Sequence, residues 1–121
     1  LARSVPVVLA GRPARKLKVD EIVLRNVEGM ERLVAYLVKL GHRRIGFIGG
    51  AAQNFASQER LRGYEAGLKA AGIPVEARWI SHGDFTAESG RRQARALLEL
   101  EQRPTALVAM NDLLAIGALK T

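Results

Sequence analysis

Polar, charged and aromatic side chains collect in the short segments that follow the apolar runs of this 121-residue chain. The apolar runs are typical of strands, and four segments each come directly after one of them: 10–12, 49–57, 81–86 and 109–112. In a parallel sheet with helical connections, such segments meet at the carboxyl edge of the strands, where ligands bind. Together they offer amides, carboxylates, a guanidinium and a phenyl ring. This mixture suits a polar small molecule with a flat or apolar face.

The segments show no pattern of residues typical of catalysis or metal binding. The chain has no cysteine and two histidines, His42 and His82, so we expect no metal site. The serines have no G-x-S-x-G setting, and the glycines of 46–50 lack the G-x-G-x-x-G spacing of a dinucleotide site. We therefore expect a binding protein that is not an enzyme and that needs no cofactor.

Hydrophobic periodicity predicts the elements that position the segments. Apolar residues at helical spacing predict four helices, from Asn26 to Gly41, Ser57 to Gly72, Thr86 to Leu100 and Leu113 to Leu119. Asn26 and Thr86 are the expected N-caps of two of them. Apolar runs predict strands over 5–9, 44–48, 79–83 and 105–109, with a further extended piece at 19–24. The alternation predicts an α/β fold with a parallel sheet, right-handed crossovers and helices on both faces.

The net charge of +7 comes from basic residues that are spread from Arg3 to Lys120. No aromatic residues interleave with the densest groups, as a single-strand nucleic-acid binder would need, so we interpret them as solvated helix faces and loops. No apolar run approaches 18 residues, and no membrane helix is expected. The absence of cysteine fits a reducing cytoplasm.

Several motifs, in their order and spacing, resemble the LacI/GalR family of transcriptional regulators over essentially the whole chain. The strongest is LGHRRIGFIGG at 40–50. It is followed by ERLRGY at 59–64, GDF at 83–85 with ESG at 88–90, RPTA at 103–106, and NDLLAIGAL at 111–119.

The resemblance implies a periplasmic-binding-protein-like fold of type I, in which ligand lies between two α/β subdomains. Residues 1–24 would be the end of the N-terminal subdomain and the crossover segment. Residues 25–121 would be a partial C-terminal, effector-binding subdomain. A DNA-binding head would precede Leu1, and further strands would follow Thr121. The implied partners are a small-molecule effector (a sugar, nucleoside or related metabolite), operator DNA through the head, and a second copy in a homodimer. The implied location is the cytoplasm, without membrane contact.

The resemblance also implies candidate ligand contacts. Arg60 matches the family arginine that reaches effector oxygens, and a guanidinium offers forked donors for them. Phe85 matches an aromatic position that packs on sugar or base, although an aromatic residue under the loop could equally belong to the core. Asn54 and Ala56 hold loop positions where family members contact ligand. Ala10 stands where sugar-binding members can carry an acidic residue, which weakens the case for carbohydrate.

Asn111 and Asp112 lie at a strand-to-helix turn, where one is expected to cap the last helix. We assign ligand contact to Asn111 first and a structural role to Asp112, with Asp112 kept as a second candidate. Asp84 is expected to organise its turn.

A periplasmic-type sugar- or solute-binding protein is the alternative function, because it uses the same architecture. A helix-turn-helix encoded upstream of Leu1 would favour the regulator, and a signal peptide would favour transport. We further expect the first strand to be disordered or to pair with a second copy. The chain alone should bind effector poorly, since half of the crevice wall would be absent.

Overall fold

The computed structural model describes residues 4–121, so the first three residues of the predicted segment 1–24 lie outside the described part. The elements in chain order are strands β1 (Val8–Ala10) and β2 (Asp20–Ile22), helix α1 (Asn26–Lys39), strand β3 (Ile45–Ile48), helix α2 (Phe55–Ala70), a 3-10 turn (Ala77–Trp79), strand β4 (Ile80–Ser81), helix α3 (Ala87–Leu98), strand β5 (Ala106–Ala109) and helix α4 (Asp112–Leu119).

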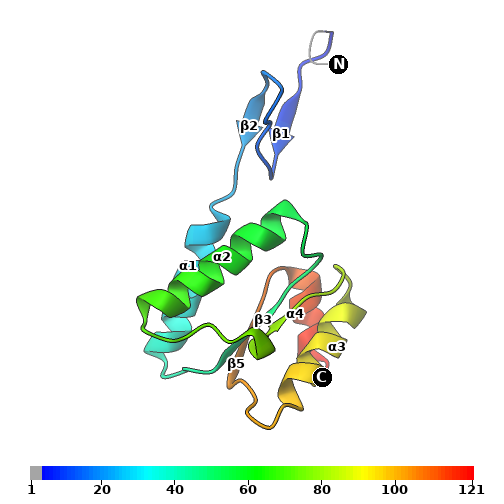
Figure 1. The fold of residues 1–121 in the computed structure, drawn as a ribbon. Helices are drawn as coiled ribbons and strands as arrows, with labels where there is room; N and C mark the ends of the chain where they lie inside the picture. The colour runs from blue at the N-terminus through cyan, green and yellow to red at the C-terminus, as the bar shows by residue number, and fades with distance from the viewer. Residues whose placement is uncertain (1–3) are drawn as a thin grey trace.

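The body of the molecule is a three-stranded parallel sheet in the order β4-β3-β5. Its central strand, β3, is buried along its whole length, as the continuous apolar run at 45–48 predicts. Figure 1 shows the sheet between two helix pairs, α1 with α2 on one side and α3 with α4 on the other. The predicted α/β class, with helices on both faces of a parallel sheet, is confirmed.

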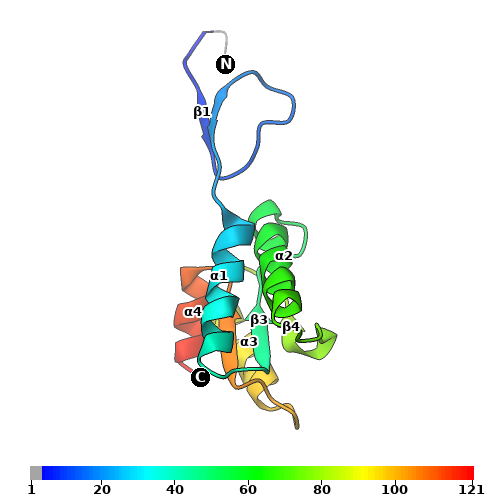
Figure 2. The ribbon, with the colours of Figure 1, turned by 90° about the vertical axis from the view of Figure 1, so that its left-hand side faces the viewer.

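Strands β1 and β2 form a separate two-stranded parallel arm, with Val8 opposite Asp20 and Ala10 opposite Ile22. The arm stands away from the body and joins it through residues 23–25 (Figures 1 and 2). The first strand was expected to be disordered or to pair with a second copy. It is ordered and pairs with β2 of the same chain, since residues 11–19 are long enough to return the chain alongside it. Pairing with a second copy stays a prediction.

The helix ends correct two of the predictions. Asn26 is not an N-cap: Arg25 occupies the cap position without a side-chain bond, and Asn26 is the first residue of α1. Helix α2 begins at Phe55, before the predicted Ser57, because Asn54 caps it by accepting from the Ser57 N–H at 3.0 Å. Thr86 is confirmed as the cap of α3. Gly41 ends α1 in the left-handed conformation, with φ of 99°.

Close contacts at glycine join the two helices within each layer. A methyl group on Gly67 of α2 would lie 2.8 Å from Cβ of Val34 on α1. On the other face, a methyl group on Gly117 of α4 would lie 2.7 Å from the carbonyl carbon of Ala87 at the start of α3. The two helices of each pair therefore approach at a distance that only glycine permits, and a larger side chain there would force them apart.

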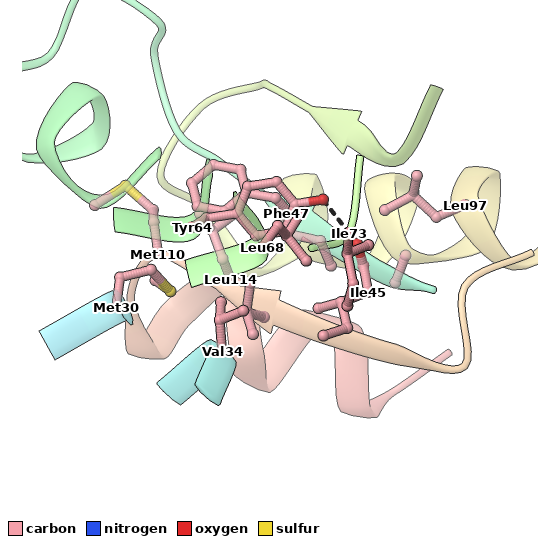
Figure 3. Packing of buried hydrophobic residues seen from close by; sticks show 13 residues of the cluster. Met30, Val34, Ile45, Phe47, Tyr64, Leu68, Ile73, Leu97, Met110 and Leu114 are labelled. Atoms are coloured by element: carbon pink, nitrogen blue, oxygen red, sulfur yellow. Dashed lines mark hydrogen bonds between the residues drawn. The ribbon is translucent and has the colours of Figure 1, made fainter. Parts of the chain in front are cut away.

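The core lies between the sheet and the α1–α2 pair and continues to α3 and α4 (Figure 3). Phe47 of β3 packs against Tyr64 of α2 with ring centroids 5.3 Å apart. The Tyr64 hydroxyl donates to the Ile45 carbonyl at 2.7 Å, the bond drawn in Figure 3. This buried bond ties α2 to the beginning of β3.

Replacement of Tyr64 by Phe tests that bond. At neutral pH we expect a loss of about 1–2 kcal/mol in the free energy of unfolding, because a buried carbonyl loses its donor. Burial, and then the neighbouring Glu65, raise the pKa of Tyr64 from 10.0 to about 12. The folded state therefore holds the proton more tightly than the unfolded state. This stabilisation is complete below pH 10 and is lost as the pH rises to about 12.

Urea unfolding of the wild type and Tyr64→Phe at pH 7, 10 and 11.5 measures both effects. The difference in free energy of unfolding between the wild type and Tyr64→Phe should shrink above pH 10, because only the wild type has this proton to lose. An advantage that stays constant up to pH 11.5 would show that Tyr64 ionises equally easily in both states.

Candidate ligand-binding site

Hydrogen bonds beyond the strand ends hold three loops side by side. The Met110 N–H donates to the Ile48 carbonyl at 2.9 Å, and the Gly49 N–H donates to the Ser81 carbonyl at 2.8 Å. The loops that follow β3, β4 and β5 therefore meet at the end of the body that faces the arm (Figure 1). The predicted meeting of 49–57, 81–86 and 109–112 is confirmed. The fourth predicted segment, 10–12, lies in the arm, where the Gly11 N–H donates to the Ile22 carbonyl.

Arg60 lies on α2 next to Met110, just beyond the end of β5, and is half-buried. Its Nε donates to the side-chain oxygen of Asn26 at 3.0 Å, and its Nη1 donates to the Met110 carbonyl. Neither acceptor carries a charge. Within residues 4–121, no carboxylate forms an ion pair with this guanidinium. Arg60 thus remains a partly desolvated cation with unused donors.

Sequence reasoning assigned Asn26 the wrong role. Its side chain does not cap α1 but accepts from Arg60, and the residue is only 7% exposed. A signal for this existed in the topology. A helix that precedes a parallel strand begins at the carboxyl edge of the sheet, as does a helix that follows one. The topology therefore requires the first residues of α1 and α2 to lie at the same edge of the sheet.

Two other amides in the site, Asn54 and Asn111, do serve as helix caps. Asn111 caps α4: its side-chain oxygen accepts from the Leu114 N–H at 3.0 Å. One of the two residues does cap α4, as expected. The assignment of the structural role to Asp112 is wrong for the cap, because Asn111 is the residue whose side chain accepts from the first turn. Because capping uses the oxygen alone, the NH₂ group of Asn111 keeps its donors. Asp112 is exposed as the first residue of α4, and Asn54 is exposed at the start of α2.

Phe85 packs directly over a glycine of the neighbouring loop. A methyl group on Gly50 would collide with the Phe85 ring. The ring is half-buried and also packs against the hydrophobic core. The buried side of the Phe85 ring therefore has a structural role, and the rest of the ring is exposed at the loop that follows β4. Ala56, in the first turn of α2, is half-buried against the same core.

A buried amide links two of the loops and was missed by sequence reasoning. Gln93 of α3 donates from Nε2 to the Gly49 carbonyl at 2.9 Å and to the Ser89 hydroxyl at 3.0 Å. The Ser89 hydroxyl in turn accepts from the Asp84 N–H at 3.2 Å. The polar Gln93 at a helix position facing the sheet is the signal that could have found this link.

The turn that carries Phe85 is stabilised by Asp84, as predicted. The Thr86 hydroxyl and backbone N–H both donate to the Asp84 carboxylate, and these bonds lower the pKa of Asp84 below its ordinary value. The carboxylate therefore organises its own turn.

A cavity of about 350 Å³ opens beside Arg60. Its lining combines the start of α1 with the end of β5: Leu24, Arg25, Asn26, Gly29, Met30, Leu33, Arg60 and Met110. A larger groove, about 710 Å³, runs instead between α2 and the turn at 72–75, and contains none of the candidate ligand contacts. Across residues 4–121, no group of three or more His, Asp or Glu side chains could hold a metal ion.

A comparison with protein families decides the assignment of the fold. The family model described as "periplasmic binding protein-like domain" matches residues 34–121 of this chain. The chain belongs to this family.

Individual relatives in the family are transcriptional regulators. The HTH-type transcriptional repressor CytR of Escherichia coli K12 is 38% identical over 114 residues, which are 94% of this chain and 33% of CytR. The repressor PurR of Actinobacillus pleuropneumoniae is 38% identical over 100 residues, or 83% of this chain and 30% of PurR. The chain thus spans about a third of the length of these curated relatives.

Solved structures of the family share the fold. A sugar-binding LacI-family regulator from Escherichia coli, in complex with phosphate, superposes with a TM-score of 0.87 at 35% identity, covering 98% of this chain and 43% of that one. A LacI-family regulatory protein from Chloroflexus aggregans gives a TM-score of 0.87 at 33% identity, with the same coverage. The resemblance to the LacI/GalR family and the periplasmic-binding-protein-like fold are both confirmed. In the part of the chain that the structure describes, no helix has the length and apolar character to span a bilayer.

The capping role of Asn111 can be measured separately from any ligand. Asn111→Ala should lower the free energy of unfolding by about 1 kcal/mol, because the Leu114 N–H loses its acceptor. Asn111→Asp should retain the wild-type stability, since a carboxylate also caps and its charge suits a helix N-terminus. Urea unfolding of the three proteins distinguishes these outcomes. Equal destabilisation by both substitutions would mean that the cap contributes nothing and that the NH₂ group is the structural part.

Proposed function

We propose that this chain forms most of one effector-binding subdomain of a LacI-type transcriptional regulator. A small molecule would bind where β3, β4 and β5 end and would change the affinity of a DNA-binding head for its operator. The observation that carries the proposal is Arg60, a half-buried guanidinium beside the end of β5, with two neutral acceptors and no carboxylate partner within residues 4–121. A desolvated cation is stabilised by an oxygen-bearing ligand.

The surrounding groups indicate the class of effector. Arg60 and the NH₂ group of Asn111 are donors, which suits hydroxyl, carbonyl or phosphate oxygens. The half-buried Phe85 ring offers a face for a sugar or base. Asn54, Ala56 and Asp112 would complete this wall, with Ala56 contributing shape alone. Ala10, at the end of β1, supplies no acid for sugar hydroxyls. A nucleoside or related metabolite therefore fits the wall better than a simple sugar.

The arm fits the same proposal. Residues 1–24 would belong to the N-terminal subdomain and the crossover, and residues 25–121 to the C-terminal subdomain. Several apolar side chains of the arm and of the linker to the body are exposed, including Val8, Ile22 and Val23 at 56–60%. A sheet of the other subdomain would cover them. Ligand binding between the subdomains would then favour one of two arrangements and so alter operator affinity.

The known relatives support the regulator over the solute-binding alternative, because CytR and PurR are named as HTH-type transcriptional repressors. By the same analogy, the whole protein would act as a homodimer in the cytoplasm and bind operator DNA through a separate head. Its role would be binding and not catalysis, since the residues that gather at the strand ends are donors, caps and an aromatic ring.

The test uses the full-length protein and a panel of ribose, glucose, uridine, adenosine, guanine and inorganic phosphate. Calorimetry should identify one compound that binds, and that compound should shift the affinity for an operator selected from random DNA. Arg60→Gln should weaken binding at least about tenfold, the equivalent of one charge-assisted hydrogen bond. Arg62→Gln, two residues further along the exposed side of α2, is the matched control and should bind normally.

Asn111→Asp adds a sharper result, because it keeps the cap and removes the donor. It should fold with wild-type stability yet bind the same compound about tenfold more weakly. If Arg60→Gln and Asn111→Asp both bind as the wild type does, the site lies elsewhere on the chain. If no compound of the panel alters operator affinity, the effector class assigned here is wrong.

A further inference from the structure

The Arg60 guanidinium is fixed on two of its edges by acceptors from different elements. Nε donates to the Asn26 side chain on α1 at 3.0 Å, and Nη1 donates to the Met110 carbonyl just beyond β5. A guanidinium is planar, so two acceptors at Nε and Nη1 define the orientation of the plane. The remaining N–H groups of the fork then have a single direction in which to meet a ligand.

The two acceptors differ in how easily they can be lost. The Met110 carbonyl belongs to the backbone, and the Met110 N–H is itself bonded to the Ile48 carbonyl, so this acceptor is a fixed part of the sheet. The other acceptor is a side chain. The orientation of Arg60 therefore depends on one replaceable residue, Asn26.

Asn26 has no other role in the described chain that would account for an amide at this place. It is 7% exposed, and the helix that it begins has no side-chain cap. Its neighbours in the cavity beside Arg60 include Leu24, whose side chain has no acceptor, and Met30 and Met110, whose thioether sulfurs are only weak acceptors. An apolar residue at position 26 would fill the space but would leave Nε of Arg60 without an acceptor.

We propose that Asn26 is a positioning residue, which holds the Arg60 guanidinium in the orientation that presents its free N–H groups to the effector. This inference rests on the proposed function for the ligand, although the positioning itself can be measured without one. Asn26 also directly follows residues 23–25, the linker between arm and body. The bond therefore connects the ligand-binding arginine to the point where the arm is attached.

The experiment is an NMR measurement on the full-length protein without ligand. It records the exchange with water of the Arg60 Nε–H proton, identified by its absence from Arg60→Lys. The variants are Asn26→Leu, which removes the acceptor, and Asn26→Asp, which restores one. Val34→Ala is the matched control, because it removes buried volume from the same helix without touching Arg60.

Asn26→Leu should accelerate exchange about tenfold, as expected for the loss of one hydrogen bond. Asn26→Asp should return it to the wild-type rate or below, and Val34→Ala should leave it unchanged. If Asn26 had only a structural role, Asn26→Leu and Val34→Ala would change the exchange rate of the Arg60 Nε–H proton equally. That result would overturn the proposal. Unchanged exchange in Asn26→Leu would overturn it as well.

Calorimetry with the six named compounds completes the test. For whichever compound binds the wild type, Asn26→Leu should weaken binding about tenfold, and Val34→Ala should leave it unchanged. If Asn26→Leu accelerates exchange but binds that compound normally, the presentation of Arg60 to ligand is refuted. If none of the six binds while exchange responds as expected, the positioning of the guanidinium stands and the proposed effector class fails.

Discussion

The pairing of β3 with a parallel neighbour on each side is the constraint on which the candidate site depends. Parallel pairing brings the carboxyl ends of three strands to one edge, and backbone bonds from Gly49 and Met110 extend the pairing into the following loops. The loops are then no longer independent of one another. Arg60 can reach the Met110 carbonyl, and Phe85 can lie over Gly50, because the strands have already brought 110 and 50 to the same edge. A change in sheet register would therefore break the Arg60–Met110 and Phe85–Gly50 contacts at the same time.

Side-chain caps make the same edge both structural and available for ligand. Asn54 and Asn111 each satisfy a helix N-terminus with the amide oxygen, which leaves the NH₂ donors for another partner. Arg60 likewise uses part of its fork inside the protein. In the proposed site, structural and binding roles would therefore be divided between atoms of one residue. This division explains how a site can be rigid before ligand arrives, which reduces the entropy lost on binding.

Much of the architecture could be predicted from the sequence, because it depends on local signals. The apolar run at 45–48, the glycine at 41 and the threonine at 86 each placed an element or its end. What could not be predicted depends on contacts between distant positions. Asn26 and Arg60 are 34 residues apart, and Gln93 and Gly49 are 44 apart, so neither contact leaves a periodic trace. The loop segments could be predicted from topology. Which amide caps a helix and which accepts from Arg60 depends on the packing of the folded chain, and it could not be predicted.

The central claim is that ligand binds at the joined ends of β3, β4 and β5. Hydrogen–deuterium exchange of the full-length protein, with and without the compound that binds most tightly in calorimetry, tests it directly. The account predicts that bound compound slows exchange in 49–57, 81–86 and 109–112 together, while the groove between α2 and the turn at 72–75 is unaffected. Slowed exchange at 72–75, with the three loops unchanged, would contradict it.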